Sequence, residues 1–223
     1  VITFPGSNCD RDMNVALKKF GFKNKMVWHD DVELPKSDLV VLPGGFSYGD
    51  YLRCGSMASK SKIMKSVINF ANSGGMVMGI CNGFQILVET GLVPGVLLRN
   101  KYLEFICKNV FVKINDKKNT YFKNIDKEVL EFHIAHNEGN YFCTNDQLKE
   151  IEDNEQVAIN YCNKEGKTEE NFNPNGSIKN IAGIFNKEKN VLGMMPHPER
   201  MIDPSLSGED GSLFFNNLIN NLK

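Results

Sequence analysis

A cysteine between two glycines marks the place in this chain where chemistry is most expected. The segment Gly79-Ile80-Cys81-Asn82-Gly83 follows the apolar run Met76–Met78 and leads at once into an apolar helical pattern. Strand, tight turn and helix in this order form a nucleophile elbow, whose glycines let the backbone turn without Cβ clashes. The first N–H groups of the helix and the positive end of its dipole stabilise a thiolate. An isolated cysteine is more often a buried turn residue, but the flanking glycines favour a nucleophile at Cys81.

A base for this nucleophile is expected at His197. A cysteine nucleophile needs a base and usually a group that orients the base. His197 lies in Pro196-His197-Pro198-Glu199 after an apolar run, and its proline neighbours favour an extended backbone. Side chains two apart in an extended chain point the same way, so Glu199 can orient the imidazole. The alternative is a polar surface turn with a His–Glu pair, and the cysteine elbow favours the catalytic interpretation.

The three remaining histidines fit other settings. His29 lies beside Asp30 and Asp31, which is typical of a solvated loop. His133 alternates with apolar residues and is interpreted as a strand residue. His136 lies in a polar turn, where a role in the site stays open.

A glycine turn at the end of a neighbouring apolar run offers an oxyanion donor. Pro43-Gly44-Gly45-Phe46 follows the run Leu39–Leu42. Glycines at a strand end commonly serve only the turn itself. In a cysteine hydrolase, a free N–H here would face the developing oxyanion together with the N–H of Asn82, and one such donor contributes about 3–4 kcal/mol.

Length and organisation favour one domain. The chain has 223 residues, enough for one large α/β domain or two small ones, and no stretch rich in Pro, Gly or Ser divides it. We therefore expect a single domain over residues 1–223. The chain opens on Val1–Phe4, as though a strand were already under way, so we expect a few preceding residues to be missing.

Composition excludes several kinds of partner. The 26 Lys and Arg residues and 27 Asp and Glu residues give a net charge of -1, so no nucleic-acid partner is expected. No apolar run could cross a bilayer and no leader pattern is present, so no membrane partner is expected either. The six cysteines lack CxxC spacing and the four histidines lack HExxH spacing, so we expect no metal site. Scattered reduced thiols indicate a cytoplasmic protein.

The two halves of the chain differ in pattern. Strands and helices alternate up to residue 90, which predicts an α/β fold with parallel strands, helices on both faces and a site at the carboxyl ends of the strands. Short-linked strand candidates in the second half predict an antiparallel or mixed extension of the same sheet. The strands are expected at 1–4, 25–28, 39–42, 76–80, 110–114, 129–134, 156–161, 181–185 and 191–195. A terminal helix is expected at 211–222.

A phosphate-loop signature is absent. Gly166-Lys167-Thr168 resembles the end of such a loop, but Tyr161 occupies the position of its first glycine. We expect a surface turn there and no cofactor in this chain.

With these residues assembled, the chain resembles the class I glutamine amidotransferases, which carry a Cys-His-Glu triad on a flavodoxin-like fold. The elbow and the Pro-His-Pro-Glu turn are typical of the whole superfamily. The segments Gly44–Tyr51 and Asn173–Ser177 are more specific and resemble members that serve the fourth step of purine synthesis. The matching stretches run nearly end to end: Phe4–Asp10, Pro43–Gly55, Gly79–Leu87, Asn173–Ser177 and Pro196–Arg200.

The resemblance implies a role for each matching residue. Cys81 would attack the side-chain amide of L-glutamine, His197 would shuttle protons and Glu199 would orient His197. Gly45 and Asn82 would form the oxyanion hole. Gln85 and the turn formed by His136, Asn137 and Glu138 would bind the glutamine α-amino and α-carboxylate groups.

The resemblance also implies partners. Ammonia would pass to a separate synthetase subunit that carries ATP and Mg and makes formylglycinamidine ribonucleotide, and a small third subunit would bridge the two. Two alternatives remain open: an amidotransferase subunit that feeds another acceptor, and a non-catalytic glutamine-sensing protein on the same fold.

One residue departs from the family pattern. Asn137 stands where the family usually has Gly after the histidine of this turn. Asn is the non-Gly residue that best tolerates a left-handed backbone, so we expect the turn to survive.

Overall fold

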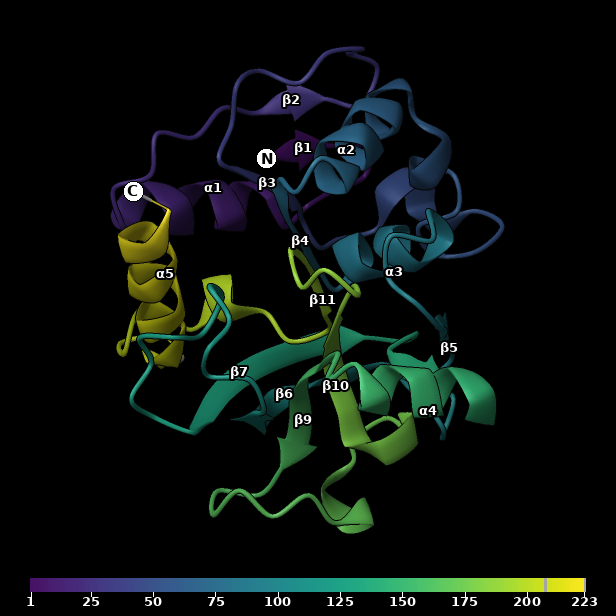
Figure 1. Cartoon of the computed structure of the whole chain (residues 1–223), viewed down its shortest axis with the longest axis vertical. Helices are drawn as coiled ribbons and strands as arrows, with labels where there is room; N and C mark the ends of the chain where they lie inside the picture. Colours follow the sequence, from purple (N-terminus) through teal and green to yellow (C-terminus); the bar gives the residue numbers. More distant parts are fainter. Residues whose placement is uncertain (207, 223) are drawn as a thin grey trace.

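A seven-stranded sheet runs through the middle of the molecule, with helices on both sides (Figure 1). The computed structural model describes residues 1–206 and 208–222. The strands of this sheet are β3 (Leu39–Leu42), β4 (Met76–Ile80), β6 (Ile106–Ile114), β7 (Val129–His136), β9 (Val157–Cys162), β10 (Ile181–Phe185) and β11 (Val191–Met194). They lie in the order β3-β4-β11-β10-β9-β6-β7.

Helices flank the strands that carry the elbow. The helices are α1 (Asp10–Lys19), α2 (Lys62–Asn72), α3 (Asn82–Glu89), α4 (Asn145–Asp153) and α5 (Asp210–Asn221). Figure 1 shows α1 and α5 on one side of the β3–β4–β11 column, and α2 and α3 on the other. Helix α3 packs against β3, β4 and β11, and α5 packs against β7. The elbow is therefore held between the sheet and the first turn of α3.

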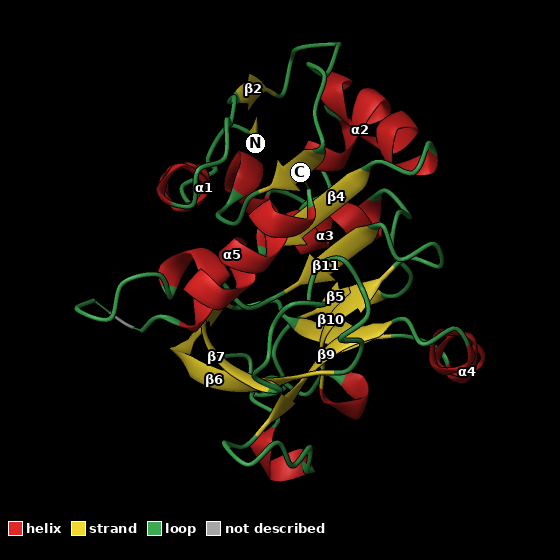
Figure 2. Cartoon of the chain, turned by 60° about the vertical axis from the view of Figure 1, so that its left-hand side comes forward, coloured by secondary structure: helices red, strands yellow, loops and turns green. Residues whose placement is uncertain are grey.

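The sheet is parallel at one end and antiparallel at the other. Strand β4 pairs in parallel with both β3 and β11. The other four pairs, from β11 through β10, β9 and β6 to β7, are antiparallel. Seen from the side, the strands descend from β4 to β6 and β7, which lie at the far end of the sheet (Figure 2). The predicted α/β sheet with an antiparallel extension is confirmed, and the extension supplies most of the strand pairs.

Two short sheets complete the strands. Strand β1 (Ile2–Thr3) pairs in parallel with β2 (Val27–Trp28) beside β3, and β5 (Val96–Leu98) pairs antiparallel with β8 (Asn140–Phe142). Strands β5 and β8 were not predicted from the sequence. Helix α4 was not predicted either, although Thr144 and Gln147 form the capping box that starts this helix. That Thr-x-x-Gln spacing is visible in the sequence.

Burial along the strands follows their position in the sheet. Every residue of β10 and β11 is buried, because neighbours cover these central strands on both faces. Residues of β7 alternate between half-buried and buried, so one face of this strand lies on the core. The other face carries Glu131, His133 and Ala135.

One hydrophobic cluster joins both halves of the chain, from Ile2 on β1 to Leu218 on α5. The single domain stays a prediction, and this continuous core supports it. Within the described ranges, no helix is long and apolar enough to span a membrane.

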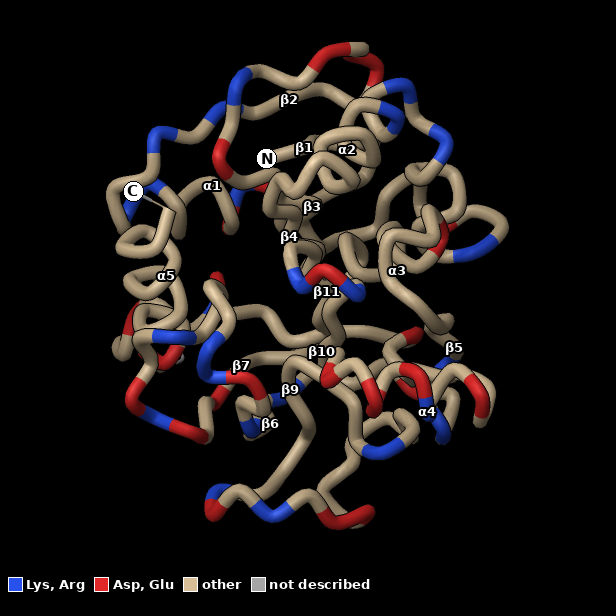
Figure 3. Tube along the Cα trace, in the orientation of Figure 1, with Lys and Arg blue, Asp and Glu red and all other residues tan. Residues whose placement is uncertain are grey.

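Charged residues of both signs are interspersed along the trace. Figure 3 shows Lys and Arg beside Asp and Glu in both the upper and the lower half of the molecule. In this view, the net charge of -1 is therefore not the sum of two large oppositely charged faces.

Candidate active site

Cys81 lies at the tip of the turn between β4 and α3. Its backbone has φ +50° and ψ -104°, a strained conformation for a residue with a Cβ. The two glycines allow this geometry. A Cβ at Gly79 would lie 2.6 Å from the Gly83 carbonyl oxygen, and one at Gly83 would overlap the Leu42 carbonyl oxygen. The Gly-x-Cys-x-Gly pattern thus reflects close packing of α3 on β3 and β4.

His197 and Glu199 form a buried pair just after β11. The two atoms His197 Nδ1 and Glu199 Oε1 are 2.6 Å apart, and the side chains are 1% and 0% exposed. A carboxylate can only accept, so Nδ1–H donates. The other ring nitrogen, Nε2, has no complete hydrogen bond within residues 1–206 and 208–222. It is therefore the nitrogen available to Cys81.

The charge state of His197 follows from its neighbours. Burial lowers its pKa, but the Glu199 carboxylate and the nearby Cys81 sulfur together raise it from 6.5 to about 9. An imidazolium beside a cysteine is the arrangement that activates catalytic thiols. His197 therefore places a positive charge next to the Cys81 sulfur.

Cys81 and His197 open into a pocket of about 240 Å³. Gly45 also lines it, and the wall is completed by Asn8, Cys9, Phe46, Phe105, Cys107, Ala135 and Arg200. The Cys81 Sγ atom lies 3.8 Å from the Ala135 carbonyl oxygen on β7. None of the four predicted glutamine-binding residues lines this pocket.

The predicted oxyanion donors belong to the turns that follow β3 and β4. Gly45 has φ +122°, and a Cβ there would lie 2.6 Å from the Asn8 backbone nitrogen, so only Gly fits. Asn82 is the first residue of α3, and its N–H therefore has no acceptor within the helix. The Asn82 side chain accepts from the Ser47 N–H at 3.3 Å. This bond ties the glycine turn after β3 to the elbow.

Gln85 contacts the predicted glutamine-binding turn. Its Nε2 atom donates to the Glu138 carbonyl oxygen at 2.7 Å, and its Oε1 accepts from Asn82 Nδ2 at 2.8 Å. His136 is buried, and burial together with the charge of His197 lowers its pKa to about 3. His136 is therefore neutral at neutral pH. A neutral imidazole fits a residue that binds substrate better than a second proton carrier beside His197.

Asn137 does not need the conformation that its sequence position suggested. It is not among the described residues with positive φ, so the turn forms without a left-handed backbone at this position. Its carbonyl oxygen accepts from the Asn100 N–H at 2.9 Å. An ordinary backbone therefore closes this turn with Asn in place of Gly.

Metal ligands do not gather at the site. In the part of the chain that the structure describes, no group of three His, Cys, Asp or Glu residues could hold a metal ion. The chemistry described so far rests on the thiol, the imidazole and backbone N–H groups.

Comparison with known proteins assigns the family. The profile described as the CobB/CobQ-like glutamine amidotransferase domain matches residues 1–208. The chain belongs to this glutamine amidotransferase family. It is 82% identical over 223 residues to the phosphoribosylformylglycinamidine synthase subunit PurQ of Pelagibacter ubique, covering 100% of the chain and 98% of that protein. It is 50% identical to the PurQ subunit of Synechocystis, covering 96% and 97%.

A solved structure agrees with the family. The PurLQS structure from Thermotoga maritima matches with a TM-score of 0.87 and 40% identity, over 100% of this chain and 97% of that chain. The resemblance to class I glutamine amidotransferases seen in the sequence is thereby confirmed.

Asn100, which was not predicted as a site residue, organises the predicted binding turn of this amidotransferase. Its Nδ2 donates to the carbonyl oxygens of Glu104 and His136, at 2.8 and 2.9 Å. Its Oδ1 accepts from the Gly139 N–H and from His136 Nδ1, both at 3.1 Å. These bonds hold both ends of the turn and assign the neutral His136 tautomer. No local pattern around Asn100 signals this role.

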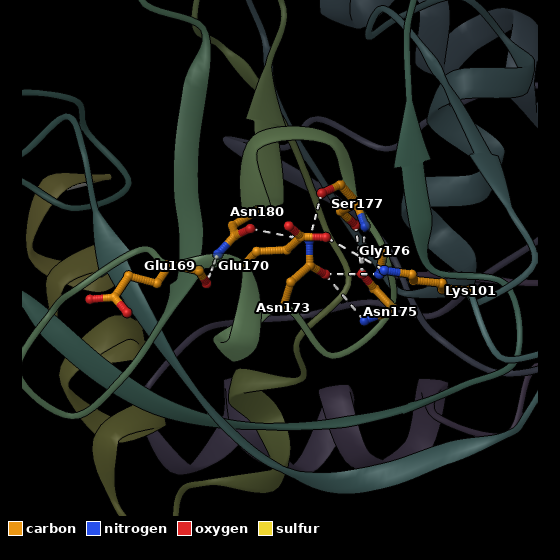
Figure 4. A network of polar contacts seen from close by, with 8 residues as sticks. All are labelled: Lys101, Glu169, Glu170, Asn173, Asn175, Gly176, Ser177 and Asn180. Atoms are coloured by element: carbon orange, nitrogen blue, oxygen red, sulfur yellow. Dashed lines mark hydrogen bonds and ion pairs between the residues drawn. The ribbon is translucent and has the colours of Figure 1, made fainter.

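The Asn173–Ser177 segment supports the same amidotransferase turn from outside. Asn173 lies at the centre of the network in Figure 4, where its Oδ1 accepts from the N–H groups of Asn175 and Gly176. These two hydrogen bonds close the loop of residues 173–177, so that the side chains of Asn175 and Ser177 face the turn. Asn175 Nδ2 and Ser177 Oγ donate to the Gly139 carbonyl oxygen at 2.8 and 3.2 Å. The family-specific motif therefore braces the turn.

Cys9 is a second buried thiol at the amidotransferase pocket. Its Sγ accepts from an Arg200 guanidinium N–H at 3.0 Å. Burial raises its pKa to about 12 despite the charge of Arg200, so Cys9 stays a thiol at neutral pH. Cys9 therefore forms part of the pocket wall and is not the nucleophile. In the sequence, only its position in the matching stretch Phe4–Asp10 indicated that it lies near the site.

Replacing Asn100 by Ala is expected to lower the free energy of unfolding by about 3 kcal/mol, because His136 and Gly139 lose buried hydrogen-bond partners. It is also expected to raise the KM for glutamine. The measurements are urea unfolding and glutaminase kinetics. Asn115→Ala removes the same atoms at an exposed site and is expected to cost below about 1 kcal/mol. Equal losses in the two variants would contradict the bracing role.

Proposed function

We propose that this chain is the glutaminase subunit of phosphoribosylformylglycinamidine synthase. It hydrolyses L-glutamine and delivers the ammonia to the ATP-dependent synthetase subunit of purine synthesis. The observation that carries the proposal is the strained Cys81 beside the buried pair of His197 and Glu199. The PurQ relatives, which match nearly end to end, support the choice of acceptor.

Cys81 is the proposed nucleophile and His197 the proton carrier. The thiolate attacks the side-chain amide carbon of glutamine and forms a C–S bond. The imidazolium gives its Nε2 proton to the amide nitrogen, the C–N bond breaks, and ammonia leaves a γ-glutamyl thioester. A water molecule then gives a proton to Nε2 as it attacks the thioester carbon. The C–S bond breaks, glutamate leaves, and the thiolate is restored.

Orientation and charge stabilisation are assigned to the surrounding groups. Glu199 holds the Nδ1–H tautomer, so that Nε2 faces the reaction. The N–H groups of Gly45 and Asn82 stabilise the oxyanion, at about 3–4 kcal/mol each. Gln85 and the turn of His136, Asn137 and Glu138 hold the amino-acid end of glutamine. Their hydrogen bonds to one another support a binding unit built before substrate arrives.

The proposed partners follow from the division of the reaction between a glutaminase subunit and a synthetase subunit. The matching PurLQS structure from Thermotoga maritima supports a synthetase partner and a third, bridging subunit. ATP and Mg would be held by the synthetase, and we propose no cofactor for this chain. The six cysteines are all free, which supports a cytoplasmic location.

Glutaminase turnover is expected to be low in the isolated chain and to rise roughly 5- to 150-fold with the synthetase and bridging subunits. The reason is that the partner completes the site and couples the two reactions. The measurement is glutamate release, together with conversion of formylglycinamide ribonucleotide to its amidine.

The alternatives give different results in the same assay. Amidation of another acceptor, with formylglycinamide ribonucleotide untouched, would mean a different amidotransferase subunit. Glutamine binding without glutamate release in any mixture would mean a sensing protein.

A further inference from the structure

Four polar side chains share the solvent-facing side of the β6–β7 strand pair. Glu131 and His133 lie on the face of β7 that points away from the core. The antiparallel register places Asn109 opposite His133, and Cys107 opposite Ala135. Because side chains repeat every two residues along a strand, Cys107 and Asn109 share this face. None of these four residues has a role in the function proposed above.

These side chains form a continuous chain of hydrogen bonds. Asn109 Nδ2 donates to Glu131 Oε1 at 3.2 Å, and Asn109 Oδ1 lies 3.0 Å from His133 Nδ1. His133 Nε2 in turn lies 3.5 Å from the Cys107 Sγ atom. A thiol, an imidazole and an orienting amide are thus present in hydrogen-bonding order.

The order of donors and acceptors assigns the proton positions. The Glu131 carboxylate can only accept, so the amide nitrogen of Asn109 faces it and the amide oxygen faces His133. His133 Nδ1 must then carry the proton, and Nε2 presents its lone pair to the Cys107 S–H. Burial and the nearby Arg200 and His197 charges lower the His133 pKa, so the ring is uncharged at neutral pH and its Nε2 lone pair is free to accept a proton.

The position of this thiol links it to the active site. Cys107 is exposed, and it lines the same 240 Å³ pocket as Cys81 and His197. The His133 carbonyl oxygen also accepts the His197 N–H at 2.8 Å. Any group attached to Cys107 would therefore occupy the pocket that Cys81 lines.

We propose that Cys107 is a second reactive thiol, activated by His133 and Asn109, which exchanges with low-molecular-weight disulfides and thereby closes the glutaminase pocket. His133 Nε2 takes the Cys107 proton, and the thiolate attacks one sulfur of the disulfide. A new S–S bond forms, the old one breaks, and the leaving thiolate takes up the proton. The disulfide is the oxidant and leaves as one thiol, and a free thiol reverses the step. The closure rests on the proposed function, whereas the exchange does not.

The exchange is tested with oxidised glutathione on the full chain carrying Cys81→Ala, which removes the competing thiol. Mass spectrometry of peptides follows the glutathionyl group at Cys107. We expect the rate at Cys107 to fall roughly 10²-fold in His133→Gln and also in Asn109→Leu, which removes the orienting acceptor. His29→Gln, the same change at a distant histidine, should leave the rate unaltered. A rate at Cys107 that is equal in all four proteins would overturn the proposal.

The closure is tested with the unsubstituted active site. The treated chain is combined with the synthetase and bridging subunits, assembly is checked by gel filtration, and glutaminase turnover is measured. We expect an assembled complex with less turnover than Cys107→Ser treated in the same way, because Cys81 reacts equally in both chains, and recovery of turnover with dithiothreitol. Retained turnover with fully modified Cys107, or lost assembly, would overturn the closure. An untreated complex without turnover would instead contradict the proposed function.

Discussion

Cys81→Ala is expected to reduce glutamine-dependent amidation by about 10⁴- to 10⁶-fold while ammonia-dependent amidation continues. Alanine offers no atom that can form the thioester, so the covalent route is lost entirely. The acceptor site on the synthetase needs only ammonia and does not depend on this side chain. The measurement is amidine formation in the assembled complex with glutamine and then with ammonium as the nitrogen source.

Cys143→Ala is the matched control for this variant. Cys143 is also buried, and burial raises its pKa, so it is an inert thiol in the same chain. Its replacement removes the same atoms and is expected to leave both activities within roughly twofold. Equal glutamine-dependent rates in Cys81→Ala and the unmodified complex would refute the nucleophile assignment.

Glu199→Gln is expected to lower kcat for glutaminase turnover by about 10²- to 10⁴-fold. The amide keeps the shape of the carboxylate but can donate to His197 Nδ1, which favours the wrong tautomer. The pKa of His197 should also fall from about 9, because burial remains while the attraction of the carboxylate is lost. The measurement is kcat as a function of pH in the assembled complex, with imidazole titration followed by NMR.

The same change has a consequence for stability. The folded-state pKa of His197 is raised from 6.5 to about 9, so the imidazolium stabilises the fold fully below pH 6.5. This contribution is lost as the pH rises through about 9. Urea unfolding should therefore show a deficit in Glu199→Gln that is large near pH 6.5 and shrinks above pH 9. Glu188→Gln, at an exposed site, should show no such dependence. A deficit independent of pH would contradict the charge pairing.

The parts of the site that the sequence predicted are those set by local chain geometry. The elbow needs glycines within two residues of Cys81, and the pairing of His197 with Glu199 needs only an extended backbone between them. Strands such as β4 and β10 were predicted with their observed bounds, because a buried strand leaves a continuous apolar run.

The parts that were missed depend on distant contacts. Asn100 meets Gly139 across 39 residues, and Arg200 meets Cys9 across 191. No spacing in the sequence encodes such pairs. The position of β11 between β4 and β10 is likewise invisible in the order of strands along the chain. Residues that brace the site are therefore harder to predict than residues that react.

The place of β11 in the sheet also bears on how the protein is made. This strand is the last of the sheet to leave the ribosome, yet it lies between two strands that are synthesised earlier. The central gap must stay open until β11 has been synthesised, and such long-range pairing is slow. The strand that fills it also brings His197 to Cys81. A chain that stops before His197 would thus present a thiol without its base, and activity would begin only after this residue has been synthesised.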